Sequence, residues 1–242
     1  MKSAKVISVY IGPRRNMNNN LLNSEQCIEF LKLQIDNEKT NDPGCELDII
    51  IVNNNTNNHE ANLYIDTLNN QKIFNGTIRV FYRQNIGGSF GAFSYAYDQI
   101  FNEYDYFLFN EDDIMITHPN YMSRAIELLN NDASVGFVSF SPISYHEPYH
   151  CGGGFGASSR RILDLIKSTY GKLPFIELNT YEDFEHSEVE FTNCIDRAGY
   201  QLINVPEYST LAQNYEKHTS QCKPQYVTDE NLNKIFIYKV GF

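Results

Sequence analysis

The chain has 242 residues, 42% of them hydrophobic and 14% aromatic, which is enough for one large α/β domain with a substantial core. Its net charge of −11 argues against nucleic acid and acidic membrane surfaces as partners, because both attract clustered lysine and arginine. No run approaches the roughly 20 apolar residues of a membrane span, and no basic, apolar leader is present, so we expect a cytoplasmic protein. Five widely spaced cysteines without a CxxC pair predict reduced thiols.

Apolar segments and glycine or proline breaks predict alternating strands and helices in the first half of the chain. We expect strands at Ala4–Ile11, Leu47–Val52 and Thr77–Tyr82, and helices at Ser24–Gln34, with Ser24 as N-cap, and Ala61–Leu68. Because crossover connections are right-handed, this alternation builds a parallel sheet with helices on both faces. We expect a single domain over residues 1–242, with 221–242 as a C-terminal extension.

The second half of the chain continues in the same style. The expected elements are a helix ending near Ile100, a strand at Tyr106–Phe109, a helix at Asn120–Asn130, a strand at Val135–Phe140, a helix opened by Cys151–Arg161 and running through Ile166, a helix at Phe191–Ala198 and a short strand at Leu202–Val205. Gly199 fits a left-handed backbone conformation directly after the helix at Phe191–Ala198.

Three consecutive carboxylates follow the most apolar strand, Tyr106–Phe109. Glu111, Asp112 and Asp113 repel one another, so their place at the mouth of a core strand favours a bound cation. Oxygen ligands on a short turn suit Mg²⁺ or Mn²⁺. A solvated acidic turn is the alternative that the spacing alone leaves open.

Other polar clusters follow neighbouring strands. Pro13–Arg15 and Asn53–Thr56 come directly after the first two strands, where an open parallel sheet binds its ligand. After Arg83, the glycine-rich segment Asn85–Ala92 opens a helix, and the Gly87 amide there could meet a phosphate or a sugar. A plain tight turn explains the same glycines.

Two further stretches carry titratable residues. His146, His150 and Cys151 suggest zinc only superficially, because Pro148 prevents a helix that would align the histidines, so we expect a loop. The segment 181–190 holds five carboxylates at the expected start of a helix, where the helix dipole favours them. One of them could instead be a general base.

Taken in order, these segments resemble the family two glycosyltransferases of the GT-A fold, over about Lys5 to Ser220. IGPRR stands at the family's opening strand and nucleotide loop, and IIIVNNNT is similar to its second strand, where asparagines replace an aspartate. QNIGGSFGA looks like its Asn-x-Gly-x-x-x-Ala segment, LFNEDDI like the strand that carries its DxD motif, and CGGGFGASSRR like its sugar-binding segment.

The resemblance implies a Rossmann-like, mostly parallel central sheet with helices on both faces. It also implies a metal-dependent, inverting glycosyltransferase that moves a sugar from a nucleotide-diphosphate donor to a hydroxyl of a glycan, lipid-linked or protein-linked acceptor. Mn²⁺ or Mg²⁺ would be held mainly by Asp113, with Glu111 or Asp112 assisting and His218 helping to hold the metal or the diphosphate. The residues expected near the donor are Pro13, Arg14, Asn53, Asn55, Arg83, Gly87, Glu111, Asp112 and Gly154.

The same resemblance implies a catalytic base before the final helix. Counting back from Gly199 places Glu188 at that position, and Asp183, in the literal letters Glu182-Asp183, is the runner-up. A non-catalytic nucleotide-sugar or carbohydrate-binding domain of the same fold is the alternative, supported by the departures at Asn53–Asn55, Glu111 and Ser187. A nucleotidyltransferase fits less well, because IGPRRN has a single glycine.

Overall fold

A computed structural model describes residues 1–12, 14–15, 21–141, 143–144, 150–151, 155–177, 181–205 and 237–239. Within these ranges, the side chains of 14–15, 21–22, 144, 150, 181–185 and 237–239 are not described.

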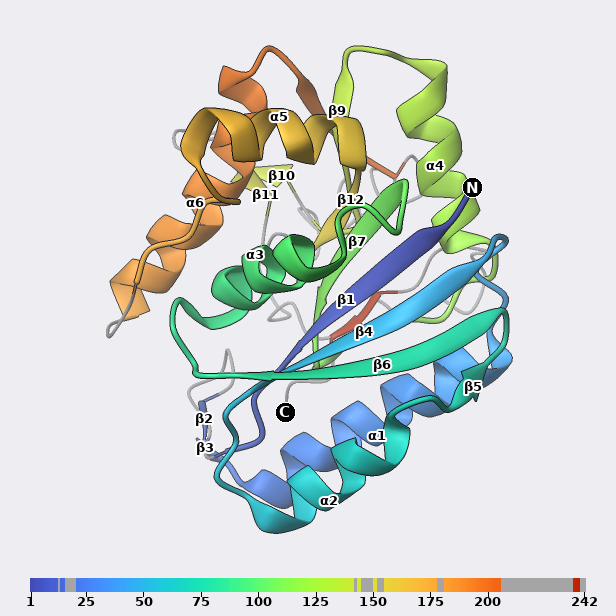
Figure 1. Ribbon diagram of the computed structural model, residues 1–242, viewed down its shortest axis with the longest axis vertical. Helices are drawn as coiled ribbons and strands as arrows, with labels where there is room; N and C mark the ends of the chain where they lie inside the picture. The colour runs from blue at the N-terminus through green and yellow to red at the C-terminus, as the bar shows by residue number, and fades with distance from the viewer. Residues whose placement is uncertain are drawn as a thin grey trace, which may run out of the picture.

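An eight-stranded sheet runs through the molecule in the order β13-β9-β12-β7-β1-β4-β6-β5 (Figure 1). Its strands are β1 (Ser3–Val9), β4 (Leu47–Asn54), β5 (Lys72–Ile73), β6 (Gly76–Arg83), β7 (Tyr106–Glu111), β9 (Val135–Ser139), β12 (Gly156–Ser159) and β13 (Gln201–Asn204). β7, β1, β4 and β6 are parallel neighbours, and so are β9 and β13. β12 lies antiparallel between β7 and β9, and β5 is antiparallel to β6. The predicted mostly parallel sheet is confirmed.

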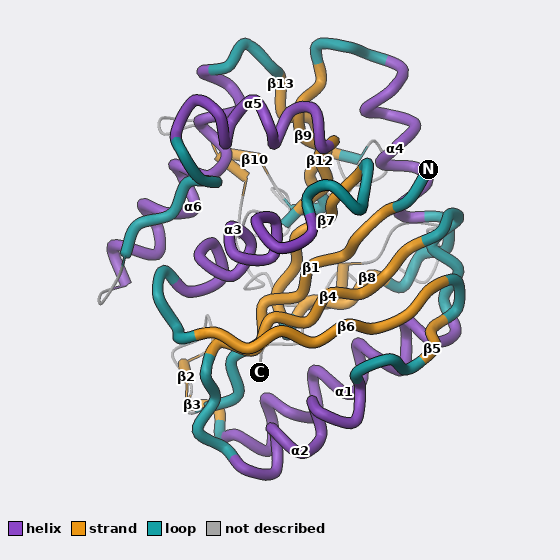
Figure 2. Tube along the Cα trace, viewed as in Figure 1, coloured by secondary structure: helices purple, strands orange, loops and turns teal. Residues whose placement is uncertain are grey.

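Helices cover both faces of the sheet, as predicted (Figure 2). On one face, α1 (Ser24–Thr40), α2 (His59–Leu68) and α4 (Tyr121–Asn131) pack in one hydrophobic cluster with the strands. On the other, α3 (Gly88–Ile100), α5 (Arg160–Tyr170) and α6 (Tyr181–Arg197) form a second cluster that is rich in aromatic rings. None of the helices in the described ranges is both long and apolar enough to cross a membrane.

Three short strand pairs lie outside the main sheet. β2 (Arg14–Arg15) pairs with β3 (Leu21–Leu22), and β10 (Ile143–Ser144) pairs with β11 (His150–Cys151). β8 (Ile114–Ile116), which follows the acidic turn, pairs with β14 (Ile237–Lys239) near the end of the chain.

Several predicted boundaries were wrong, for local reasons. Asn23 caps α1 instead of Ser24, because Asn23 and Gln26 exchange side-chain to backbone hydrogen bonds of 2.9 and 3.0 Å, which form a capping box. α6 begins at Tyr181 rather than Phe191, so the acidic segment lies within the helix.

The segment predicted to open α5 directly contains a strand. A Cβ on Gly156 would lie 2.3 Å from the Phe137 ring and 2.5 Å from the Val138 carbonyl oxygen, so only glycine permits β12 to approach β9 this closely. Gly199, with φ of +85°, has the predicted left-handed conformation after α6.

The ends of the central strands lie side by side. Ser8 is in register with Glu111, Val9 with Asn53, and Asn54 with Arg83. The chain places β4 and β6 on one side of β1 and β7 on the other, so the strand order reverses at β1. In such sheets, the crevice at the reversal point, beyond the carboxyl ends of the strands, is the usual binding site.

Candidate functional site at the carboxyl ends of the strands

The three carboxylates at the end of β7 have different surroundings. Asp112 is 1% exposed, and its carboxylate accepts a hydrogen bond of 2.9 Å from the Tyr10 backbone N–H, which ties the turn to the end of β1. Glu111 Oε1 accepts a hydrogen bond of 2.8 Å from the Ser89 hydroxyl in the first turn of α3. Asp113 Oδ1 is buried and accepts no hydrogen bond from the described residues. The three carboxylates are therefore adjacent in sequence, but their hydrogen bonding in the fold differs.

The Asp113 oxygen is the observation that bears on a metal ion. A buried carboxylate oxygen that has lost its hydrating water costs free energy unless a hydrogen-bond donor or a cation replaces that water. No group of three or more histidine, cysteine, aspartate or glutamate side chains stands ready for a metal within the described ranges. Mg²⁺ and Mn²⁺ sites need only one or two protein carboxylates, and water and phosphate supply the other ligands. Asp113 and Glu111 fit such a site.

A glycine-rich turn brings the start of α3 to the acidic turn. Gly87 is the N-cap of α3 with φ of +75°, and a Cβ there would lie 2.2 Å from the Phe175 ring, so no other residue fits without displacement. Gly88 also has a positive φ, and Ser89 then reaches Glu111. The N–H groups of this helix start lie beside the predicted metal site, where an anion is favoured.

Arg83, the last residue of β6, joins the strand ends to this turn. Its Nη1 donates to Asn54 Oδ1 at 2.6 Å and to the Gly88 carbonyl at 3.5 Å, and its Nη2 donates to the Ile86 carbonyl. Asn54 Nδ2 in turn donates to the Ser8 hydroxyl at 2.8 Å. Burial lowers the pKa of the Arg83 guanidinium, yet an arginine remains charged at any physiological pH. A cation thus stands at the strand ends, bonded here to neutral oxygens.

The asparagine run after β4 does not present all of its side chains to a ligand. Asn53 is fully buried, with its Nδ2 donating to Asn62 Oδ1 at 2.8 Å and its Oδ1 accepting from the Thr56 N–H at 3.1 Å. Because this side chain is buried, a nucleotide sugar could contact it only if the surrounding residues moved. Asn55 is exposed in a left-handed conformation with φ of +52°. Of the two asparagines predicted to meet the donor, Asn55 has the accessible side chain.

Glu188 lies on α6, beside the β10–β11 hairpin. Thr192, one turn later, accepts a hydrogen bond of 3.2 Å from the Cys151 N–H, and its own hydroxyl donates to the Glu188 carbonyl. Burial raises the pKa of Cys151 to about 12, and the Glu188 charge adds to this effect, so the carboxylate is near the thiol. Phe191 packs on Phe109 of β7 with ring centroids 5.3 Å apart. This contact fixes α6 relative to the strand that carries the acidic turn.

The runner-up for the base lies elsewhere on the same helix. Asp183 precedes Glu188 by five residues, which is about 7.5 Å along the helix axis and about 140° around it. The backbone positions of the two residues therefore lie on different faces of α6, and the Asp183 side chain is outside the described part of the chain. Ser187 is fully buried, and its hydroxyl accepts a hydrogen bond of 3.0 Å from the Ile176 N–H. Glu190 pairs instead with Arg197, at 2.5 Å.

Some predicted site residues lie outside the described part of the chain. Pro13, Gly154 and His218 are among them, and Arg14 is described only through its backbone, in β2.

Sequence reasoning missed Ser89 and Tyr10, which both hold the acidic turn. The signal for Ser89 was its place in the first turn after the glycines. The Tyr10 contact uses a backbone N–H, which no residue type reveals.

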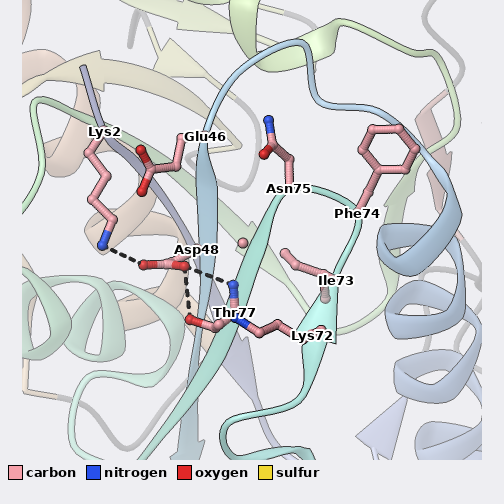
Figure 3. A pocket seen from close by; sticks show the side chains of 9 residues that line it. Lys2, Glu46, Asp48, Lys72, Ile73, Phe74, Asn75 and Thr77 are labelled. Carbon is pink, nitrogen blue, oxygen red and sulfur yellow. Dashed lines mark hydrogen bonds and ion pairs between the residues drawn. The ribbon is translucent and has the colours of Figure 1, made fainter.

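A cavity of about 460 Å³ lies at the opposite, amino-terminal edge of the strands (Figure 3). Asp48 is the buried carboxylate in it, and it accepts hydrogen bonds from Lys2 Nζ at 2.8 Å and the Thr77 N–H at 2.8 Å (Figure 3). It also accepts one from the Tyr104 hydroxyl at 2.9 Å. Burial alone would raise the pKa of Asp48, but these bonds outweigh it and lower the pKa below its ordinary value. Its hydrogen-bonding capacity is used within the protein, so we assign this cavity no part in the chemistry.

Comparison with solved structures identifies the fold. The mannosyltransferase PcManGT from Pyrobaculum calidifontis, in complex with GDP-Man and Mn²⁺, aligns with a TM-score of 0.56 and 15% identity over 92% of this chain and 65% of its own. S. aureus TarS aligns with a TM-score of 0.54 and 13% identity over 84% of this chain and 35% of its own. GalNAc-T7, in a structure with UDP, GalNAc and Mn²⁺, aligns with a TM-score of 0.51 and 14% identity over 85% of this chain and 42% of its own. No protein-family model and no curated protein sequence matches the chain.

These likenesses confirm the predicted GT-A fold. The chain spans less than two thirds of the length of each of the three proteins.

Proposed function

We propose that this chain is a metal-dependent glycosyltransferase that moves a sugar from a nucleotide-diphosphate donor to an acceptor hydroxyl. The observation that carries the proposal is the acidic turn at the strand-order reversal of a GT-A sheet, where the buried Asp113 Oδ1 accepts no hydrogen bond from the described residues. Two of the similar structures hold Mn²⁺ together with GDP-Man or with UDP and GalNAc, which supports both the donor class and the metal.

The chemistry of each carboxylate suggests its role. Asp113 would hold Mn²⁺ or Mg²⁺, with Glu111 as a second ligand, and His218 remains a predicted assistant. When bound, the metal neutralises the charge that grows on the departing diphosphate. Asp112 is already committed to the Tyr10 N–H, so we assign it to holding the turn.

The donor's diphosphate would meet two further positive features. Arg83 contributes a charged guanidinium at the end of β6, and the start of α3 contributes its backbone N–H groups and the positive end of the helix dipole. Asn55, with Pro13, Arg14 and Gly154, completes the predicted donor contacts. The acidic protein thereby offers a local positive environment to an anionic ligand.

Glu188 would act as the general base. It accepts the proton of the acceptor hydroxyl while that oxygen forms a bond to the anomeric carbon of the donor sugar. The bond between the anomeric carbon and the diphosphate oxygen breaks on the opposite side, and the diphosphate leaves with the electron pair. A single displacement of this kind inverts the anomeric configuration. We propose a glycan, free or linked to lipid or protein, as the acceptor.

A thermal-shift panel tests this function. UDP, GDP, dTDP and CMP are each added with Mn²⁺, and each measurement is repeated with a chelator. A nucleotide at 100 times its dissociation constant stabilises the native state by about 2.7 kcal/mol, so one nucleotide is expected to raise the melting temperature only when metal is present. No shift with any nucleotide would contradict the proposal.

A second candidate is a non-catalytic nucleotide-sugar-binding domain of the same fold. The observation that favours it is Ser187, which stands in the acidic segment with a buried side chain bonded to the backbone. The matching nucleotide sugar, incubated with Mn²⁺, separates the two candidates. Release of nucleoside diphosphate identifies an enzyme, whereas binding without any release identifies a binding domain.

A further inference from the structure

We infer that Gln34 of α1 and Asn110 of β7 are positioning residues, whose side-chain amides hold the acidic turn in its metal-binding conformation. The inference rests on the proposed metal site, and it concerns residues that lie behind that site and contribute no carboxylate to it.

The two amides clamp both ends of the turn. Gln34 Nε2 donates to the Glu111 carbonyl at 3.4 Å and also to the Ile114 carbonyl. Asn110 Nδ2 donates to the same Ile114 carbonyl at 2.9 Å. The Ile114 oxygen therefore accepts two side-chain donors from different elements. Asp113 lies between the clamped carbonyls, so its backbone is fixed from two directions.

Burial of both side chains costs free energy, because each has an oxygen without a hydrogen-bond donor among the described residues. Gln34 is 1% exposed and Asn110 is fully buried, yet Gln34 Oε1 and Asn110 Oδ1 are buried oxygens that accept no hydrogen bond within the described ranges. Unpaired buried oxygens are uncommon, because they lose water without a replacement. Methionine or leucine would fill similar space without an unpaired oxygen. What each amide adds is therefore its N–H donors, and both sets of donors point at the turn.

The neighbouring amides of α1 provide a comparison. Asn37 Nδ2 donates to the Ile116 carbonyl at 2.7 Å, and Asn41 Nδ2 donates to the same carbonyl at 3.0 Å. These bonds hold β8 further along, beyond the turn. Gln34 and Asn37 thus belong to one helix, and each donates an amide N–H to the segment after β7. Gln34 bonds to the acidic turn, whereas Asn37 bonds to β8.

Metal affinity depends on this support. A carboxylate that wanders must be ordered when the ion binds, and the loss of groups that orient metal ligands typically weakens binding by about 10- to 100-fold. Hydrogen bonds to the carbonyls on either side of Asp113 restrict the backbone that carries both proposed ligands, Glu111 and Asp113. The two buried amides would therefore raise the affinity for metal without touching it.

The test compares Gln34→Met with the matched control Asn37→Leu. Both variants lose an amide donor from α1, so both are expected to melt at a lower temperature than the wild type. Binding of Mn²⁺, measured by the electron paramagnetic resonance signal of the free ion well below either melting temperature, separates them. We expect Gln34→Met to weaken Mn²⁺ binding about tenfold and Asn37→Leu to leave it unchanged.

Asn110→Ser removes the second donor to Ile114 and is expected to weaken Mn²⁺ binding in the same direction, which keeps the test open if Gln34→Met does not fold. Wild-type affinity in Gln34→Met, or in Asn110→Ser, would overturn the inference. An equal loss in Asn37→Leu would also overturn it, since the effect would then be general to α1. If the wild type itself binds no Mn²⁺, the proposed function fails instead, and the two failures are distinguishable.

Discussion

Asp48 links the start of the chain to three neighbouring segments at the amino-terminal edge of the sheet. Its carboxylate accepts hydrogen bonds from Lys2, Thr77 and Tyr104, and its folded-state pKa lies below the ordinary value of 3.8. A group of this kind contributes stability that is present above its unfolded pKa and is lost as the pH falls through the folded pKa.

The substitution Asp48→Asn is therefore expected to lower the free energy of unfolding by about 1.5–3 kcal/mol near neutral pH, the range for hydrogen bonds to charged groups. The deficit should shrink toward the acid limit, because the wild-type carboxylate is then protonated too. Urea unfolding of both proteins across this pH range measures it. Asp36→Asn, at an exposed carboxylate paired with Lys39, is the control and should change little. A deficit that is independent of pH would contradict the expectation.

Asp112 and Asp113 mark the limit of what residue types reveal. The sequence predicts that carboxylates gather at the end of β7, because the acidic residues directly follow an apolar run that is typical of a buried strand. It cannot say which aspartate accepts from the Tyr10 N–H and which has an oxygen without a hydrogen-bond partner among the described residues. That difference depends on the direction of two side chains in a turn, and Gln34, distant in sequence, helps to set the turn.

At the scale of elements, a buried ion pair joins α1 to β1. Lys5 Nζ lies 2.6 Å from Glu38 Oε1, and both side chains are at most 1% exposed. Tyr121 of α4 donates its hydroxyl to Glu38 Oε2 at 2.7 Å, and burial together with the Glu38 charge raises the pKa of this tyrosine well above its ordinary value. Three elements thus meet at one charged pair inside the core.

Removing one partner should cost more than removing both. Lys5→Met leaves a buried, uncompensated carboxylate and is expected to destabilise the protein by about 3–5 kcal/mol. Lys5→Met combined with Glu38→Gln should recover most of this loss, because the glutamine still accepts from Tyr121 and carries no charge. A double-mutant cycle measured by urea unfolding gives the coupling. Additive losses would contradict the expectation.

The elements that the sequence predicts best are those whose own residues are sufficient to indicate a strand or a helix. Leu47–Val52 is apolar apart from Asp48, and it forms the fully buried core of β4. β12 was missed, because its glycine and serines lack strand propensity and the strand exists only where β7 and β9 accept it on either side. The early start of α6 was missed because charged residues mask a helix that packing on the sheet supports.

Across the whole molecule, the proposed donor and acceptor groups lie on different parts of the fold. The acidic turn extends from β7 at the centre of the sheet, whereas Glu188 belongs to α6, which packs against the sheet through Phe191. Binding of the donor and transfer of its sugar should therefore respond to different substitutions.

Asp113→Asn is expected to abolish the metal-dependent rise in melting temperature with nucleotide. Glu188→Gln should keep that rise and lower the rate of transfer by about 10²- to 10⁴-fold, the usual contribution of a general base. Product formation and thermal shift, measured on the same preparations, check both expectations. Glu190→Gln, whose carboxylate is paired with Arg197, is the control on the same helix. Undiminished turnover in Glu188→Gln would refute the base assignment.

The outer edge of the sheet is capped by the chain itself. β5 pairs with the beginning of β6, and the turn after α2 continues the cover: the Asn70 N–H donates to the Ile78 carbonyl, the Ile78 N–H donates to the Gln71 carbonyl, and the Val80 N–H donates to Asn69 Oδ1. Exposed strand edges are templates on which a second molecule can add a strand. Here residues 69–73 of the same chain already bond to the backbone at the beginning and middle of β6, so this edge should not seed aggregation.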